Sequence, residues 1–124
     1  MNAVERLESP ALGPSTGEEL AAVTGGIVRL FAEYYGHGPQ QAKSYLLGNR
    51  YVVCVLRGTM TTVEQTLAPS EPDLVRQVRL VFQEAMADSF IGVVEQAMRR
   101  RVLVYHSQLT IDPDIGFEFF LLED

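Results

Sequence analysis

The sequence predicts an α+β domain in which a four-stranded, mostly antiparallel sheet is covered on one face by helices. Two observations support this prediction. Apolar residues recur at spacings of three and four in two stretches, and two pairs of short apolar, β-branched runs are joined by turn residues. The expected order is helix, β-hairpin, short helix, long helix and β-hairpin. We expect one domain over residues 15–124, preceded by a loosely ordered leader at 1–14.

The first helix is predicted to start at residues 15–19, where two overlapping Ser/Thr-x-x-Glu capping boxes can satisfy the free amides of a first turn. Gly25-Gly26 lies inside the helical pattern and costs about 1 kcal/mol per glycine relative to alanine. The pair marks either a close approach of another backbone or a soft point in the helix. Gly36-His37-Gly38-Pro39 ends the helix. The apolar stripe consists of Leu20, Val23, Ile27, Leu30, Phe31 and Tyr34.

Two runs, 43–47 and 51–58, are predicted to form a hairpin around Gly48-Asn49, a pair suited to positive φ. The second run, YVVCVLRG, is the predicted central strand. Residues 59–68 follow as a short helix, with Thr61 or Thr62 as its cap and Glu64 in its first turn.

The strongest helical signal begins at residues 70–73, where Pro72 suits a first turn and the acids favour the helix N-terminus. Cations at residues 99–101 close this long helix. Its predicted apolar face consists of Leu74, Val78, Val81, Phe82, Ala85, Met86, Phe90, Val93, Ala97 and Met98. The last hairpin pairs a strand at 102–111, with Leu103, Tyr105, Leu109 and Ile111 on one parity, with a strand at 117–122.

Composition narrows the possible functions. Sixteen acidic residues against ten Lys and Arg give a net charge of -6, which argues against binding to nucleic acid or to anionic lipid. No apolar run approaches the roughly 18 residues of a membrane span, so we expect no transmembrane segment. Cys54 is the only cysteine, which rules out an internal disulfide and fits a reducing cytoplasm.

Several blocks of residues, in this order, resemble the MpsC-like family over roughly residues 18–123. They are Tyr34–Pro39 followed by Ala42-Lys43, Val52–Gly58 leading to Thr62–Leu67, Phe82–Met86, and Ile111–Asp114 with Phe119–Leu122. The resemblance implies a small bacterial domain, long labelled as of unknown function. It also implies association with a sodium-translocating, membrane-potential-generating system whose other members are the membrane and catalytic parts. The family supplies no catalytic residues. Its pattern often has a glycine after the long helix, where this chain has Arg99-Arg100-Arg101.

Candidate sites follow from a few residues. Cys54 is either a reactive thiol or a small core residue, and its place in an apolar strand favours the core. Gly36, His37 and Gly38 form a loop that lets a backbone approach an anion, with Lys43 nearby in sequence. Because the loop follows a helix rather than preceding one, a C-terminal cap is the favoured interpretation. An anion near His37 and Lys43 is the small-molecule alternative.

Charged residues give weaker signals. Arg57 and Glu64 are expected to form an ion pair near the surface, which contributes little to stability. Arg99 and Arg100 could bind a phosphate or an acidic partner. The alternative is that they form a solvent-exposed helix end, where cations interact favourably with the helix dipole. His37 and His106 could join Asp112 and Asp114 in space, but turn chemistry explains the two aspartates. We therefore expect neither a metal nor another cofactor.

Two functions from different classes follow. The favoured one is a non-enzymatic, cytoplasmic interaction or regulatory module. It would form a homodimer or higher homo-oligomer and dock on a protein partner at a membrane ion or bicarbonate transport system. The alternative is a small-molecule or anion sensor that uses the loop at Gly36–Pro39 together with Lys43. A small enzyme that uses Cys54 or His106 has little support in the sequence.

Overall fold

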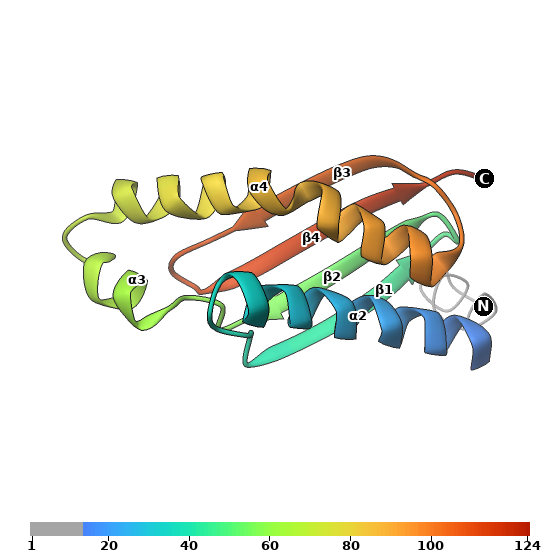
Figure 1. Ribbon diagram of the computed structural model, residues 1–124, viewed down its shortest axis with the longest axis horizontal. Coiled ribbons are helices and arrows are strands. Elements are labelled where there is room, and N and C mark those ends of the chain that lie inside the picture. Colours follow the sequence, from blue (N-terminus) through green and yellow to red (C-terminus); the bar gives the residue numbers. More distant parts are fainter. Residues whose placement is uncertain (1–13) are drawn as a thin grey trace.

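The computed structural model describes residues 14–124, so the predicted leader lies outside the described residues except for Pro14. The element order is the predicted one and confirms the α+β fold class (Figure 1). The helices are α2 (Pro14–Tyr34), α3 (Thr62–Leu67) and α4 (Pro72–Met98). The strands are β1 (Gln41–Leu47), β2 (Tyr51–Arg57), β3 (Val102–Leu109) and β4 (Ile115–Leu122).

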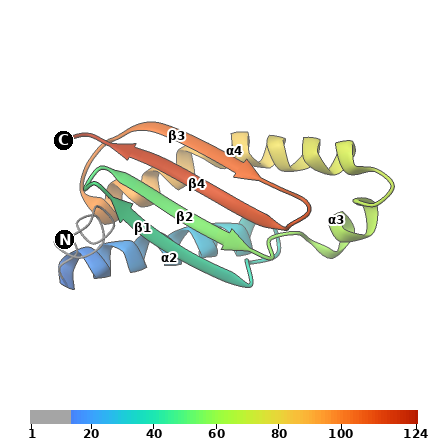
Figure 2. The same cartoon turned by 180° about the vertical axis from the view of Figure 1, so that it is seen from behind.

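The four strands form one antiparallel sheet in the order β1-β2-β4-β3. Strand β2 is therefore central, as its apolar run predicts, with β4 as its second neighbour. Helices α2 and α4 both pack on the same face of the sheet. No helix within residues 14–124 covers the opposite face, and Figure 2 shows its strands in front of the two helices. We call this uncovered side the open face.

Local signals explain most element boundaries. Helix α2 begins at Pro14, one residue before the predicted start, because proline suits a first helical turn. The β1–β2 turn places Gly48 and Asn49 both at φ 59°, as predicted. Thr61 caps α3, and its capping box with Glu64 is complete.

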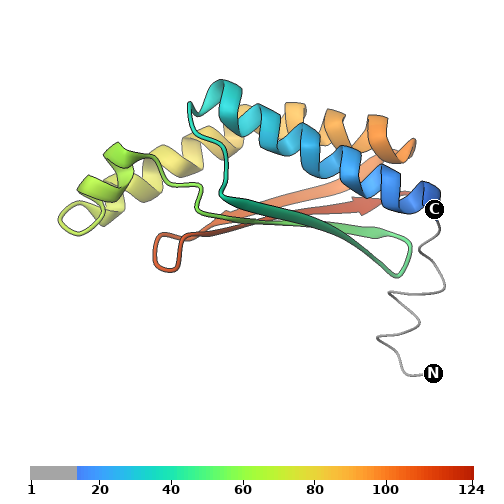
Figure 3. The same ribbon diagram turned by 90° about the horizontal axis from the view of Figure 1, so that it is seen from below.

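The predicted apolar face of α4 is only partly correct. Val75, Met86, Phe90, Val94 and Met98 are buried on this helix, and Arg79 is buried with them. The predicted core residues Leu74, Val78 and Val81 are instead 50%, 48% and 57% exposed. The reason is visible in Figure 3, where α3 and the first turns of α4 project beyond the end of the sheet.

Strand β3 also departs from its predicted parity. The register shifts between Val102 and Val104, which places Leu103 in an irregularity of the ladder and leaves it 51% exposed. From Val104 onward the strand alternates regularly, so Tyr105 and Leu109 face the helices as expected.

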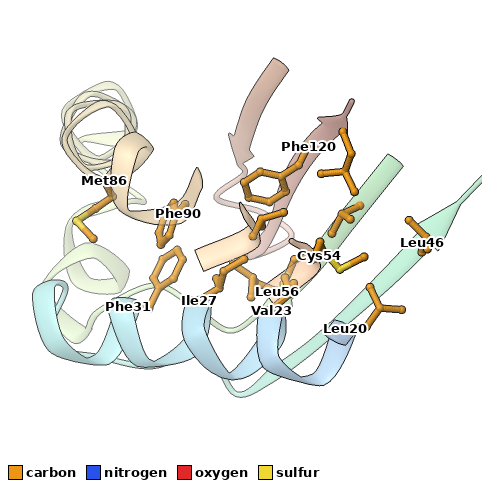
Figure 4. Packing of buried hydrophobic residues seen from close by; sticks show 14 of the residues in the cluster. Leu20, Val23, Ile27, Phe31, Leu46, Cys54, Leu56, Met86, Phe90 and Phe120 are labelled. Carbon is orange, nitrogen blue, oxygen red and sulfur yellow. The ribbon is translucent and has the colours of Figure 1, made fainter. Parts of the chain in front are cut away.

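The core lies between the helices and the covered face of the sheet (Figure 4). Phe31 of α2 stacks on Phe90 of α4, with ring centroids 5.6 Å apart. A Cβ added to Gly26 would lie 2.5 Å from a methyl group of Val93, whereas one added to Gly25 would meet nothing within 4 Å. The two glycines therefore differ. Gly26 permits close packing of α2 against a side chain of α4, rather than against a backbone, whereas Gly25 makes no such contact.

Candidate functional site

A buried polar cluster joins the projecting helices to the end of the sheet. Its members, which we call the clasp, are Tyr35, Thr59, Glu64, Arg79 and Asp114. Arg79 is 1% exposed, and its guanidinium donates to the Glu64 carboxylate at 3.0 Å, to the Tyr35 hydroxyl at 3.4 Å and to the Thr59 hydroxyl. Three segments far apart in the sequence, at Tyr35, at Thr59–Glu64 and at Asp114, thus converge on the Arg79 cation.

The acids of the clasp are held by backbone groups as well. Asp114 accepts hydrogen bonds from the amides of Thr59 and Met60, at 3.1 and 3.0 Å. Glu64 accepts from the amide of Thr61 at 3.0 Å and from the Tyr35 hydroxyl. These bonds fix α3 against the β2 and β4 ends, so the clasp sets the angle at which the helices leave the sheet.

The predicted ion pair between Arg57 and Glu64 is wrong. Glu64 is buried and pairs with Arg79, whereas Arg57 is exposed at the end of β2. Arg57 occupies a position of the open face, because β-strand side chains alternate between faces and its neighbour Leu56 is buried in the core. The Arg57 side chain therefore points to the open face, away from the clasp in which Glu64 is buried.

An apolar groove lies between α3 and α4 where they project from the sheet. We call it the overhang groove; its volume is about 210 Å³. It is lined by Tyr35, Thr61, Val63, Glu64, Leu67, Leu74, Val75 and Val78. Val63 in its lining is 66% exposed, and Val81 continues the exposed apolar residues along α4 beyond the groove. Since the clasp lies beneath, the groove has a fixed floor and apolar walls.

A second buried polar group crosses the covered face of the sheet. Ser44, Cys54, Glu118 and Ser107 are paired in register, one on each strand, and form what we call the polar row. Glu118 is 0% exposed and accepts hydrogen bonds from Ser107 and from the Tyr105 hydroxyl, the latter at 3.1 Å. Ser44 is hydrogen-bonded at the other end to Thr24 of α2, at 2.6 Å.

Burial is the largest influence on the pKa values of the two titratable groups in the polar row, Glu118 and Cys54. It raises the pKa of Glu118 from its ordinary value of 4.5 to about 7, although the hydrogen bonds from Ser107 and Tyr105 oppose the shift. Burial also raises the pKa of the Cys54 thiol to about 11. Because the thiolate is the nucleophilic form, this geometry fits a core cysteine, as predicted.

The open face is apolar at its centre and polar at its margins. On β2 and β4 its central side chains are Tyr51, Val53, Val55, Ile115, Phe117, Phe119 and Leu121. At the margins lie Gln41, Lys43, Arg57, His106 and Gln108, with Tyr45, Leu47 and Val104 between them. Glu118, the only acidic residue in the four strands, points to the other face. Among the residues of the four strands, those on the open face therefore include cations and no acid.

The residues predicted to bind an anion lie in different settings. Gly36, at φ 75°, ends α2, and His37 and Gly38 follow it in the loop. The side chain of Lys43 is on the open face, with its Nζ 5.2 Å from the centroid of the Tyr45 ring. Lys43 lines one pocket with residues of α2 and another with Val55 and Arg57 of β2, and these pockets do not include residues 36–38. An anion site at this loop stays a prediction.

The arginines after α4 make contacts within the chain. Arg99 takes the left-handed conformation at φ 55°, and its side chain pairs with Glu19 at 3.2 Å. Arg100 donates to the carbonyl oxygens of Asn49 and Glu123, at 2.7 and 3.0 Å. Arg100 thus links the helix end to the β1–β2 turn and to the C-terminal strand.

Arg79 and Glu118 were missed as site residues from the sequence, although each leaves a signal. Arg79 lies four residues after Val75 and three before Phe82, in the middle of an apolar helical stripe. Glu118 shares its parity with Phe120 and Leu122 in a strand that is otherwise apolar. An ionisable residue at a position that the apolar pattern predicts to be buried indicates a group that is either ion-paired or neutral.

These features define a class: a small α+β domain with helices on one side of an antiparallel sheet and apolar surface exposed outside the core. The chain belongs to the family described as Na+-translocating membrane potential-generating system (MpsC), which matches residues 16–124 and confirms the resemblance. Comparison with curated proteins and with solved structures finds no match. Within residues 14–124, no helix has both the length and the apolar character needed to cross a membrane.

Proposed function

We propose that this domain is a non-enzymatic, cytosolic interaction module of a membrane ion-translocating system. It docks on that system by binding a basic amphipathic helix in the overhang groove. The family description supplies the system, and the groove supplies the surface. The observation that carries the proposal is the exposed apolar row beside a groove whose lining is almost entirely apolar.

The geometry of the row suits a helix. Leu74, Val78, Val81 and Ala85 follow one another at spacings of four, three and four, and all are exposed. This spacing places them along one side of α4 and is the pattern by which packed helices interdigitate. An amphipathic helix laid in such a groove inserts its own apolar residues at the same spacings.

Charge favours a basic partner helix. Glu84 and Asp88 are exposed on α4 and lie three and seven residues after Val81, so they flank the apolar row. The chain as a whole carries a net charge of -6. Cytoplasmic segments next to transmembrane helices are enriched in Lys and Arg. A juxtamembrane segment of this kind therefore complements both the groove and its acidic flank.

Two matched substitutions on α4 test the proposal. Val78 and Leu80 are 48% and 52% exposed and lie on opposite sides of the helix, because each residue advances it by about 100°. Tagged full-length wild type, Val78→Lys and Leu80→Lys are purified from detergent-solubilised membranes of cells that make the protein. Subunits of the translocating system that co-purify are quantified by mass spectrometry.

We expect Val78→Lys to reduce the recovery of those subunits at least tenfold, because a cation in the groove loses apolar contact and repels a basic helix. Leu80→Lys should behave as wild type. Recovery that Val78→Lys does not change, or wild type that recovers no such subunit, contradicts the proposal.

A further inference from the structure

The open face has the residue pattern of a surface that is covered. An antiparallel sheet with one solvated face normally alternates apolar and polar side chains, whereas strands buried on both faces read as continuous apolar runs. Strands β2 and β4 read YVVCVLR and IGFEFFLL, with apolar residues on both parities. On the open face, Phe117 is 42%, Tyr51 39% and Val104 50% exposed.

The layout of the open face is that of a protein interface. Its centre is aromatic and branched aliphatic, and its polar side chains lie at the two edge strands and at the end of β2. Specific interfaces have this arrangement of an apolar core within a polar rim. An exposed apolar patch of this extent on a single chain marks an interaction site.

We infer that the open face binds a second copy of this chain, so that two sheets stack face to face in a two-fold dimer. The inference is independent of the overhang groove, which lies on the helix side of the molecule. Two sheets with the same twist are complementary in shape and pack with their strands about 30° apart. A two-fold axis is the commonest way in which identical chains close.

The charges of the open face limit the repulsion between two copies at this face. Two chains of net charge -6 repel each other, and the strands of the open face offer a surface without acids. Lys43 and Arg57 lie toward one corner of the sheet, on β1 and at the end of β2. A two-fold axis that lies between stacked sheets places one edge, or one end, of a sheet over the opposite edge or end of the other sheet. The corner with Lys43 and Arg57 therefore faces a different corner of the partner, and the cations of the two copies do not meet.

The size of the face is sufficient for a reversible dimer. Four strands of about seven residues span roughly 19 Å across and 23 Å along. Stacking two such faces, with their projecting rings, buries on the order of 1,000 Å² in total, near the lower limit for a specific interface. We therefore expect an association that depends on protein concentration.

The test measures the mass of the full-length protein by sedimentation velocity and light scattering across a wide concentration range. Wild type should reach twice the chain mass of 13.8 kDa. Phe117→Lys, at the centre of the open face, should raise the dissociation constant at least tenfold, because it places a cation in the apolar core of the interface. Leu80→Lys, on the helix side, is the matched control and should dimerise as wild type does.

If Phe117→Lys does not fold, as judged by circular dichroism, Val104→Lys on edge strand β3 takes its place. A wild type that stays monomeric at every concentration overturns the inference. The inference is also overturned if Phe117→Lys dimerises as tightly as wild type, or if Val78→Lys dissociates the dimer. If the protein is a monomer that still co-purifies with the translocating system, the dimer is overturned and the proposed function stands. If it is a dimer that does not co-purify with that system, the proposed function fails and the dimer stands.

Discussion

At the scale of single residues, Glu118 has the least ordinary environment. It lies under two helices with no exposed surface, and a tyrosine and a serine donate to it. Burial raises its pKa to about 7, so the folded protein holds a proton there that the unfolded chain releases near pH 4.5. Folding and protonation at this position are therefore linked.

The sign of the linkage gives a prediction. Between pH 4.5 and 7 the unfolded state is ionised while the folded state stays protonated, so stability falls as the pH rises through this window. The free energy of unfolding should drop by about 3 kcal/mol, since one pKa unit corresponds to about 1.4 kcal/mol. Glu118→Gln keeps the shape and removes the titration.

Urea denaturation of wild type and Glu118→Gln at pH 4.5, 6, 7 and 8 measures this effect. The difference in unfolding free energy between the two proteins should shift in favour of the variant by about 3 kcal/mol across the series. Because both proteins share every other titrating group, the difference isolates Glu118. A constant difference from pH 4.5 to 8 would show that the carboxyl group has an ordinary pKa.

At the scale of elements, helix α2 shows how two identical neighbours differ in role. Gly25 faces open space, whereas Gly26 lies against Val93 of α4. Alanine is favoured over glycine in a helix by about 1 kcal/mol, so the packing at each position decides the outcome.

We predict opposite signs for two substitutions. Gly25→Ala should raise the free energy of unfolding by roughly 0.5–1 kcal/mol, because it adds helix propensity without a contact. Gly26→Ala should lower it by roughly 1–3 kcal/mol, since its methyl group forces Val93 to move. Each variant is the control for the other in urea or thermal denaturation. Stabilisation by both would mean that α2 and α4 pack less closely at Gly26, whereas destabilisation by both would mean that Gly25 does not face open space.

At the scale of the whole molecule, the clasp connects the sheet to the helices that project from it. Arg79 is bonded at its terminal nitrogens, and within the described part of the chain its Nε has no partner. Buried ion pairs are costly to break from one side, because the remaining charge is stranded, but less costly to replace as a pair.

Arg79→Met should therefore destabilise the protein by roughly 3–5 kcal/mol, since it leaves Glu64 buried without its cation. Adding Glu64→Gln should recover at least about 1 kcal/mol, because glutamine keeps an acceptor for the Thr61 amide and carries no charge. Urea denaturation of the single and double variants measures both values. A double variant less stable than Arg79→Met would refute the stranded-charge explanation.

The same scale explains which parts of the site could be predicted. Element order, the central strand and the β1–β2 turn depend on neighbours close in sequence, and all were predicted from local patterns. The cap of α3 was narrowed to Thr61 or Thr62, and the structure selects Thr61. The partner of Glu64 depends on which helix crosses which strand end. Arg79, fifteen residues further on, could not be preferred over Arg57 without knowledge of the faces of the sheet.

The sequence by itself determined the fold class, the family and the burial of Cys54, because periodicity, capping and motif order are local properties of the chain. Only the tertiary structure decided which apolar residues are left uncovered. Periodicity marks Leu74, Val78 and Val81 as apolar helix positions, but the sheet ends before it reaches them. Likewise, apolar runs in β2 and β4 predict burial, but α2 and α4 lie on one side, so the other side has no covering helix within residues 14–124. Burial requires a covering element, and the position of that element is not encoded locally.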